Sequence, residues 1–235
     1  MESASRFSVK RAIISIIYSL APGWAWPRLA RKFRNKWAAL TLEQTAHELF
    51  AGMPFPITQK EKEIVTLLGR LESLKPETLC EIGAAGGGSL FLFCRAASSK
   101  ARILSLDIAY TPVKMKTFKC FASDRQKITC LKVDSHDLTA IDKARKWLNG
   151  GAFDFLFIDG DHTFESVRRD YDYYAPFVRR GGLIAFHDIA EDARGRTGGV
   201  PALWKILKSE HPESFTEIVE NHDQNGFGIG VLVKK

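Results

Sequence analysis

A nine-residue stretch rich in glycine and alanine constrains the fold of this chain more than any other segment. It lies between a short apolar run and a helix-like apolar run at 90–97, and it reads Glu81-Ile82-Gly83-Ala84-Ala85-Gly86-Gly87-Gly88-Ser89. The order of strand, glycine turn and helix is typical of a nucleotide-type pocket, because small residues let a ligand approach the bare backbone and the N–H groups of a helix. The stretch therefore predicts an α/β fold with a nucleotide-like ligand at this turn.

Charge and spacing separate three ligands for the turn. A phosphate-binding loop needs a lysine after its last glycine, and Ser89 stands there. The G-x-G-x-x-G pattern of a dinucleotide site is not met in either register of the glycines. Glu81 would repel a pyrophosphate, yet it suits a ligand that carries an ammonium and a sulfonium, which points to S-adenosylmethionine. The alternative is an ordinary tight turn between a strand and a helix.

Strand and helix patterns alternate from residue 78 to the end of the chain. The run 153–158 is nearly all apolar, as expected for a central parallel strand covered on both faces. Asn225-Gly226 is a hairpin signal between the last two strand patterns. Strands are predicted at 78–82, 102–107, 128–132, 153–159, 182–187, 215–220 and 227–234. Helices are predicted at 87–98, 112–122, 138–148, 163–178 and 200–209.

This order predicts an α/β fold: a Rossmann-like, doubly wound, seven-stranded sheet with a reversed C-terminal strand, plus an N-terminal helical extension. We divide the chain into a basic helical arm, residues 1–57, and a Rossmann-like domain, residues 58–235. The net charge of +7 resides in residues 1–40, which hold eight basic residues and one acidic residue, while the rest of the chain is balanced. A domain without a basic excess argues against a nucleic-acid partner.

The arm allows two interpretations. Its apolar decapeptide, 12–21, is far shorter than the ~20 residues that span a bilayer. Basic side chains beside Trp24, Trp26 and Trp37 suggest that residues 1–40 lie on an anionic membrane surface. The alternative, which we favour, is a helix pair that covers the active site or packs in a homo-oligomer. The four cysteines show no C-x-x-C spacing, so we expect reduced thiols in a cytoplasmic protein, with membrane association through the arm left open.

Polar side chains stand where the predicted strands end, and in a doubly wound sheet ligands bind outside these carboxyl ends. Asp107 ends the second strand, where a carboxylate can accept both ribose hydroxyls of a bound nucleoside; a helix N-cap is its alternative role. After the third strand, Asp134 or Ser135 is placed to bond the adenine amino group. These residues extend the predicted cofactor site beyond the glycine turn.

The fourth and fifth strands end in Asp159-Gly160-Asp161-His162 and Phe186-His187-Asp188. Because these two ends are neighbours in the sheet, Asp159 and Asp188 can converge on one hard cation, and Mg²⁺ fits carboxylate ligands. Such a metal lowers the pKa of a substrate oxygen, and His162 is placed to take the proton as a general base. In a plainer interpretation, Asp161 only caps the next helix and His187 only donates a hydrogen bond.

At these residues the chain resembles class I methyltransferases, most closely the metal-dependent O-methyltransferases of small molecules (the catechol and caffeoyl-coenzyme A enzymes) and their bacterial relatives that methylate antibiotics and sugars. The resemblance covers about residues 60–235. It implies cofactor contacts at Glu81, Gly83, Ala84, Gly87, Ser89, Asp107, Asp134, Ser135 and Asp159. It implies metal ligands at Asp159, His187 and Asp188. Two positions depart from the family, since His162 replaces its catalytic lysine and His187-Asp188 replaces its Asp-Asn metal pair.

The resemblance implies S-adenosylmethionine-dependent O-methylation of a small-molecule or sugar hydroxyl, assisted by a divalent metal. Methylation of RNA or protein is an alternative, as is a non-catalytic binding protein that retains the fold. Residues 189–204 are expected to form a mobile lid whose Arg194, Arg196 and Trp204 touch the acceptor, or else a plain surface loop.

Overall fold

The computed structural model describes residues 22–52, 55–221 and 223–235. The apolar decapeptide at 12–21, to which the sequence assigns a membrane or covering role, lies outside these ranges. Within them, no helix combines the length and the apolar character that crossing a membrane requires.

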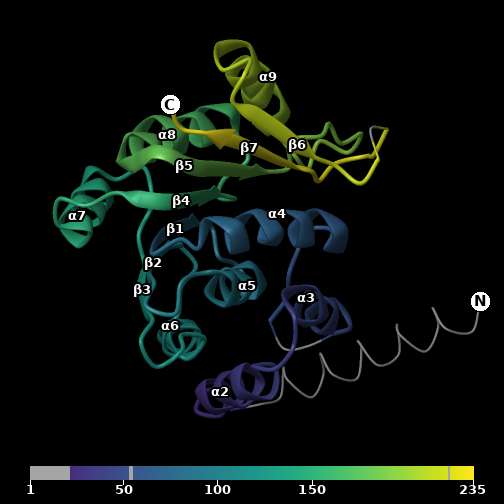
Figure 1. Ribbon diagram of the computed structural model, residues 1–235. Helices are drawn as coiled ribbons and strands as arrows, with labels where there is room; N and C mark the ends of the chain where they lie inside the picture. The colour runs from purple at the N-terminus through teal and green to yellow at the C-terminus, as the bar shows by residue number, and fades with distance from the viewer. Residues whose placement is uncertain (1–21, 53–54, 222) are drawn as a thin grey trace, which may run out of the picture.

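A seven-stranded sheet forms the centre of the molecule (Figure 1). Its strand order is β3-β2-β1-β4-β5-β7-β6; strands β1 to β5 are parallel, and β7 runs antiparallel to both β5 and β6. The predicted doubly wound sheet with a reversed C-terminal strand is confirmed. The bounds are β1 Thr78–Ile82, β2 Arg102–Leu106, β3 Lys127–Leu131, β4 Phe153–Ile158, β5 Val178–His187, β6 Phe215–Ile218 and β7 Ile229–Val233.

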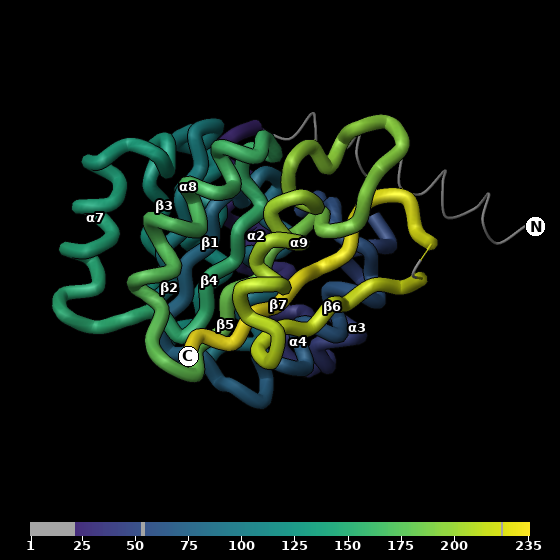
Figure 2. The backbone as a smooth tube through the Cα atoms, turned by 90° about the horizontal axis from the view of Figure 1, so that it is seen from above, coloured from purple at the N-terminus to yellow at the C-terminus, as the bar shows by residue number. Residues whose placement is uncertain are grey.

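Helices cover both faces of the sheet. In Figure 1, α8 and α9 lie above the sheet and α4 and α5 below it, and Figure 2 shows α7, α8 and α9 on the near side. Because the central strands bury apolar side chains on both faces, each face has its own core, and the four cysteines lie in these cores as free thiols, as predicted. The bounds are α4 Glu61–Leu74, α5 Gly88–Ala96, α6 Pro112–Lys119, α7 Leu138–Leu148, α8 Phe164–Tyr174, η1 Ala175–Phe177 and α9 Val200–Glu210.

The described part of the N-terminal arm packs into the core beneath the sheet. Helix α2 (Trp26–Lys36) buries Ala30 and Phe33, and α3 (Leu42–Phe50) begins with a capping box between Thr41 and Gln44. The buried ring of Trp37 contacts Phe91 of α5 edge-on, with 5.5 Å between ring centroids. The described arm therefore shares a core with the domain, which agrees with a covering role.

Two local features differ from the sequence expectations. Strand β5 begins at Val178 rather than at 182, because the register with β4 shifts and lets Gly181-Gly182 bulge. The connection from β6 to β7 runs over 219–228 instead of turning tightly at Asn225-Gly226. Glu63 on α4 holds this connection by accepting hydrogen bonds from the backbone N–H of Gly228 (2.9 Å) and from Gln224 (2.7 Å).

Candidate active site

Three cavities meet at the carboxyl ends of the parallel strands. The aromatic cavity, of about 660 Å³, lies between the turn at 83–86, segment 55–59 and α6, and it includes Trp26 of α2. The acidic cavity, of about 460 Å³, lies at the ends of β2 and β3. The histidine cavity, of about 520 Å³, lies at the ends of β4 and β5. Asp159 and Ala85 line all three, so the cavities adjoin at this corner.

The glycine turn is shaped by close backbone contacts. Gly83 has a φ of +84°, and a Cβ there would lie 2.0 Å from the carbonyl oxygen of Asp159, so only glycine fits. Gly88 packs against the backbone of Pro56. Its N–H donates to the carbonyl of Pro56 (3.1 Å), and a Cβ on residue 88 would overlap that carbonyl. Gly87 faces the ring of Phe118 and lines none of the three cavities. A ligand can therefore reach the turn at 83–86, and the cofactor contact at Gly87 stays a prediction.

Glu81 lies beneath the turn rather than in a cavity wall. It is 1% exposed, and it accepts hydrogen bonds from the hydroxyls of Ser89 (2.6 Å) and Ser105 (3.3 Å). Burial raises the pKa of Glu81 to about 8, so the carboxyl is largely uncharged at neutral pH. In this structure Glu81 braces the turn against β2, and the negative charge on which its predicted ligand preference depended is suppressed.

Asp107 is not the N-cap of α6, a position that Thr111 takes. Its carboxylate accepts hydrogen bonds from the backbone N–H groups of Ala85 (2.9 Å) and Ala109 (2.6 Å), which ties the glycine turn to the end of β2. It also lines the acidic cavity together with Asp134 and Ser135. The structure thus brings the three residues predicted for ribose and adenine to one cavity.

A contact between His136, in the wall of the acidic cavity, and two aspartates was missed from the sequence. His136 lies 3.2 Å from Asp134 through Nδ1 and 3.2 Å from Asp170 of α8 through Nε2. Asp170 is fully buried, and burial raises its pKa to about 6. The sequence shows only that Asp170 has an inward position on its helix, and this position does not identify His136 as its partner. The contact fixes the loop after β3 against α8.

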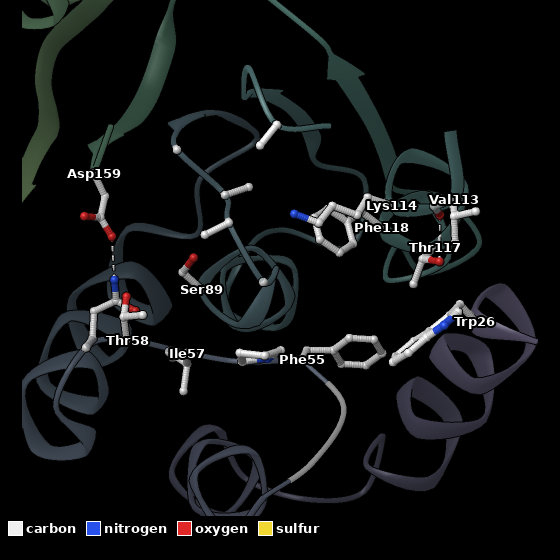
Figure 3. A pocket seen from close by; sticks show the side chains of 17 residues that line it. Trp26, Phe55, Ile57, Thr58, Ser89, Val113, Lys114, Thr117, Phe118 and Asp159 are labelled. Carbon is white, nitrogen blue, oxygen red and sulfur yellow. Dashed lines mark hydrogen bonds between the residues drawn. The ribbon is translucent and has the colours of Figure 1, made fainter. Parts of the chain in front are cut away.

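Asp159 at the end of β4 is the centre of the site. Gln59, which lies 100 residues earlier in the chain, donates a hydrogen bond to its Oδ2 at 2.6 Å (Figure 3, dashed line). Burial acts to raise the pKa of Asp159, but the neighbouring His187 and His162 outweigh it and hold the pKa below its ordinary value. The carboxylate therefore stays charged. No sequence pattern marked Gln59 as part of the site.

His162 is oriented by the backbone of the following loop. Its Nδ1 donates to the carbonyl oxygen of Arg196 (2.9 Å), which leaves Nε2 facing Asp159 at 3.6 Å and Asp188 at 3.5 Å. The hydrogen bond to Asp159 opposes the effect of burial and raises the pKa of His162 to about 9. The role of His162 as a general base stays a prediction, and its Nε2 is the ring atom that faces the two carboxylates.

A compact set of donor atoms surrounds this histidine. One ligand atom each from Asp159, His162 and Asp188 lie within 4.8 Å of one another, close enough to hold a metal ion. His187 is more deeply buried, at 3% exposure, and its Nδ1 lies 3.3 Å from each of the two carboxylates. The predicted set joined the two aspartates with His187, which contacts both of them, and the structure adds His162 as a further nitrogen donor. Asp188 has a φ of +63°, a strained backbone of the kind found at functional sites.

The loop expected to be a mobile lid is tied to the β6–β7 connection. The N–H of Ala190 donates to the carbonyl of Phe227 (2.9 Å), and Arg196 makes two 2.9 Å hydrogen bonds to the carboxylate of Asp192. Arg196 still lines the histidine cavity, and Arg194 is exposed. The prediction for Trp204 is wrong: it is 2% exposed, and its indole N–H donates to Glu217 (2.7 Å). It packs in the core because α9 lies on the sheet.

Comparisons with known proteins agree with this arrangement. A family model described as a methyltransferase domain matches residues 80–189. An uncharacterised protein of Acanthamoeba polyphaga mimivirus is 33% identical over 137 residues, which are 55% of this chain and 59% of that protein. The chain thus spans less than two thirds of the length of this relative.

Two solved structures illustrate the shared fold. An O-methyltransferase from Bacillus cereus, in complex with SAH, has a TM-score of 0.56 at 16% identity and covers 91% of this chain and 100% of its own. The MycE methyltransferase of the mycinamycin biosynthetic pathway, in complex with Mg and SAH, has a TM-score of 0.57 at 19% identity and covers 82% of this chain and 54% of its own. Residues 80–189 of this chain match a methyltransferase domain, and the chain shares its fold with these two solved methyltransferases.

Proposed function

We propose that this protein transfers the methyl group of S-adenosylmethionine to a hydroxyl of a small molecule or sugar. The observation that supports this most is the junction of three cavities at Asp159 and Ala85. When one end of a ligand fills the acidic cavity and the rest extends past this corner, its central atoms lie beside the carboxylates and histidines of the histidine cavity. An adenosyl sulfonium has this extended shape, with the reactive methyl in the middle.

The residues of the acidic cavity fit the adenosine half of the cofactor. Both oxygens of Asp107 already accept backbone N–H groups, and each keeps a lone pair for a ribose hydroxyl. Asp134 and Ser135 line the same cavity for the adenine. When bound, S-adenosylmethionine supplies an electrophilic methyl carbon on sulfur. The chain's contribution is to hold the acceptor oxygen in line with that carbon, chiefly through positioning and electrostatics.

The cluster at the ends of β4 and β5 fits a divalent cation. Asp159 and Asp188 offer carboxylate oxygens, and His162 offers Nε2, because its Nδ1 proton is held by a backbone carbonyl. Two carboxylates suit the predicted Mg²⁺, and the added nitrogen also suits Mn²⁺. A cation held here would lower the pKa of an adjacent acceptor hydroxyl. In this assignment His162 binds metal instead of acting as the base, and Gln59 holds the Asp159 carboxylate in place.

Calorimetry with S-adenosylhomocysteine tests the proposal directly. We expect one molecule to bind per chain, and we expect Asp107→Ala to weaken binding by about tenfold or more, since hydrogen bonds to a charged group are lost. The matched control is Asp124→Ala, because Asp124 is an exposed aspartate far from the cavities. Absence of binding to the wild-type protein would exclude the proposed cofactor. Assembly of the chain into a homo-oligomer, which the sequence analysis expects, stays a prediction.

We further propose that the outer face of α2 contacts an anionic membrane surface. Its inner face is buried in the core, while its outer face exposes basic side chains without a nearby acid in residues 22–40: Arg28, Arg31, Lys32 and Lys36. Trp24 is 67% exposed beside this face, with the guanidinium of Arg28 5.3 Å from its ring centroid. An exposed tryptophan among basic residues fits the headgroup region of a bilayer.

Liposome sedimentation tests this contact. The protein should bind vesicles that contain phosphatidylserine but not vesicles of phosphatidylcholine alone. The double variant Arg31→Glu/Lys32→Glu should bind at least about tenfold more weakly, because each basic residue contributes about 1 kcal/mol near such a surface. Lys143→Glu on the exposed face of α7 serves as the control. Equal binding by both variants, or binding to single-stranded RNA in place of vesicles, would rule out the membrane contact.

A further inference from the structure

The ammonium group of Lys114 points into the aromatic cavity from α6 (Figure 3). The two other lysines of this helix, Lys116 and Lys119, are exposed, whereas Lys114 is half-buried. Among the described residues, the hydrogen bond of Lys114 is made by its backbone N–H, to Thr111, and its ammonium has no acceptor. A half-buried ammonium that points into a cavity is placed to pair with an anionic group of a ligand.

The charges of the aromatic cavity restrict what that group belongs to. Its walls are largely apolar, and they carry one cation, Lys114, and one anion, Asp159, on opposite sides of the cavity (Figure 3). The turn at 83–86 lies between them. A ligand that satisfies both walls carries one positive and one negative group, as the α-amino-acid part of the proposed cofactor does.

Two hydroxyl groups of the same cavity have their protons engaged elsewhere, and the third, on Thr58, lies on the Asp159 side (Figure 3). Ser89 donates to Glu81 (2.6 Å), and Thr117 donates to the carbonyl of Val113 (2.8 Å). The side-chain amide of Gln59 donates to Asp159. Lys114 is therefore the charged donor that remains for a carboxylate at this end of the cavity.

We propose that Lys114 binds the α-carboxylate of S-adenosylmethionine, with the α-ammonium toward Asp159; this rests on the proposed function. An adenosine in the acidic cavity must continue past Ala85 and Asp159, which line both cavities, and this directs the amino-acid end toward Lys114. Fixing both charged groups of that end sets the position of the sulfur at the corner where the histidine cavity opens. Lys114 is thus a cofactor-binding residue that no motif marks.

The test compares two ligands that differ in the amino-acid group. S-adenosylhomocysteine carries it, and 5'-methylthioadenosine has the same adenosine and a thioether but lacks it. We expect Lys114→Met to weaken binding of S-adenosylhomocysteine by about tenfold to a hundredfold, as for a lost hydrogen bond between charged groups, and to leave 5'-methylthioadenosine unchanged. Lys114→Arg should restore part of the affinity. Lys116→Met, the exposed neighbour on α6, should change neither affinity.

Four results would overturn the assignment, and they are distinguishable. Unchanged affinity of Lys114→Met for S-adenosylhomocysteine would show that Lys114 does not bind the carboxylate. Equal weakening for both ligands would show a disturbed fold instead of a lost charge pair. If the wild-type protein binds neither ligand, the proposed function itself fails, whereas binding of 5'-methylthioadenosine alone keeps the adenosine site and removes only the role of Lys114.

Discussion

Asp159→Asn is expected to weaken divalent-cation binding by about a hundredfold or more and to abolish detectable methyl transfer. The reason is that Asp159 lines all three cavities and contacts both histidines. Asparagine keeps the size of the side chain but removes the charge that lies between His162 and His187. Asp188 is then the one carboxylate left in this set, and a neutral amide oxygen holds a divalent cation more weakly than a charged carboxylate does. Mn²⁺ titration followed by electron paramagnetic resonance measures the first effect. Transfer of labelled methyl to a panel of hydroxyl compounds measures the second.

The matched control for this variant is Asp172→Asn on α8. Asp172 makes an exposed pair with Arg168, which is worth only about 0.5 kcal/mol, so metal binding and methyl transfer should be unchanged. Metal assistance would be excluded if the Asp159→Asn variant still bound S-adenosylhomocysteine and still transferred methyl groups, both with and without EDTA. The proposed cofactor would survive that result, because its adenosine contacts lie in the acidic cavity.

Gly83→Ala is expected to lower the free energy of unfolding by about 3 kcal/mol or more. A left-handed backbone costs an alanine about 1–2 kcal/mol, and overlap with the Asp159 carbonyl, 2.0 Å from the new Cβ, forces the end of β4 to move. Urea unfolding measures the loss. The same shift displaces Asp159, so affinity for S-adenosylhomocysteine should fall as well.

Gly150→Ala separates the two causes. Gly150 has a φ of +82°, almost that of Gly83, but no atom lies within 4 Å of the position its Cβ would take. We expect it to lose only about 1 kcal/mol, the cost of the backbone alone. Equal losses at the two positions would mean that the close approach of β1 and β4 is not what requires glycine at 83.

The sheet could be predicted in detail because its signals are local. Apolar runs of strand length alternate with helical patterns, and a parallel sheet needs both faces covered, so seven strands and a reversed final strand followed. The bulge at Gly181-Gly182 and the long 219–228 connection were not predicted. Both depend on partners in other elements, namely β4 for the bulge and Glu63 of α4 for the connection.

The candidate site was only partly predictable, for a related reason. The strand-end residues Asp107, Asp134, Asp159 and Asp188 could be grouped because carboxyl ends of parallel strands meet at one edge. Gln59 and Lys114 come from elements that reach the site only after folding. Trp204 was placed wrongly because its position on the helix was ignored; Val200, Leu203, Trp204 and Leu207 form one buried stripe.

The sequence by itself determined the order of the elements, the glycine turn and the set of acids at the strand ends, since these follow from short-range patterns. Only the tertiary structure decided what those groups do. Burial raises the pKa of Glu81 to about 8, a backbone carbonyl turns His162 toward the two carboxylates, and the chain at 55–57 packs against Gly88. Each outcome depends on distances and solvent exclusion between segments far apart in the chain, which no local pattern contains.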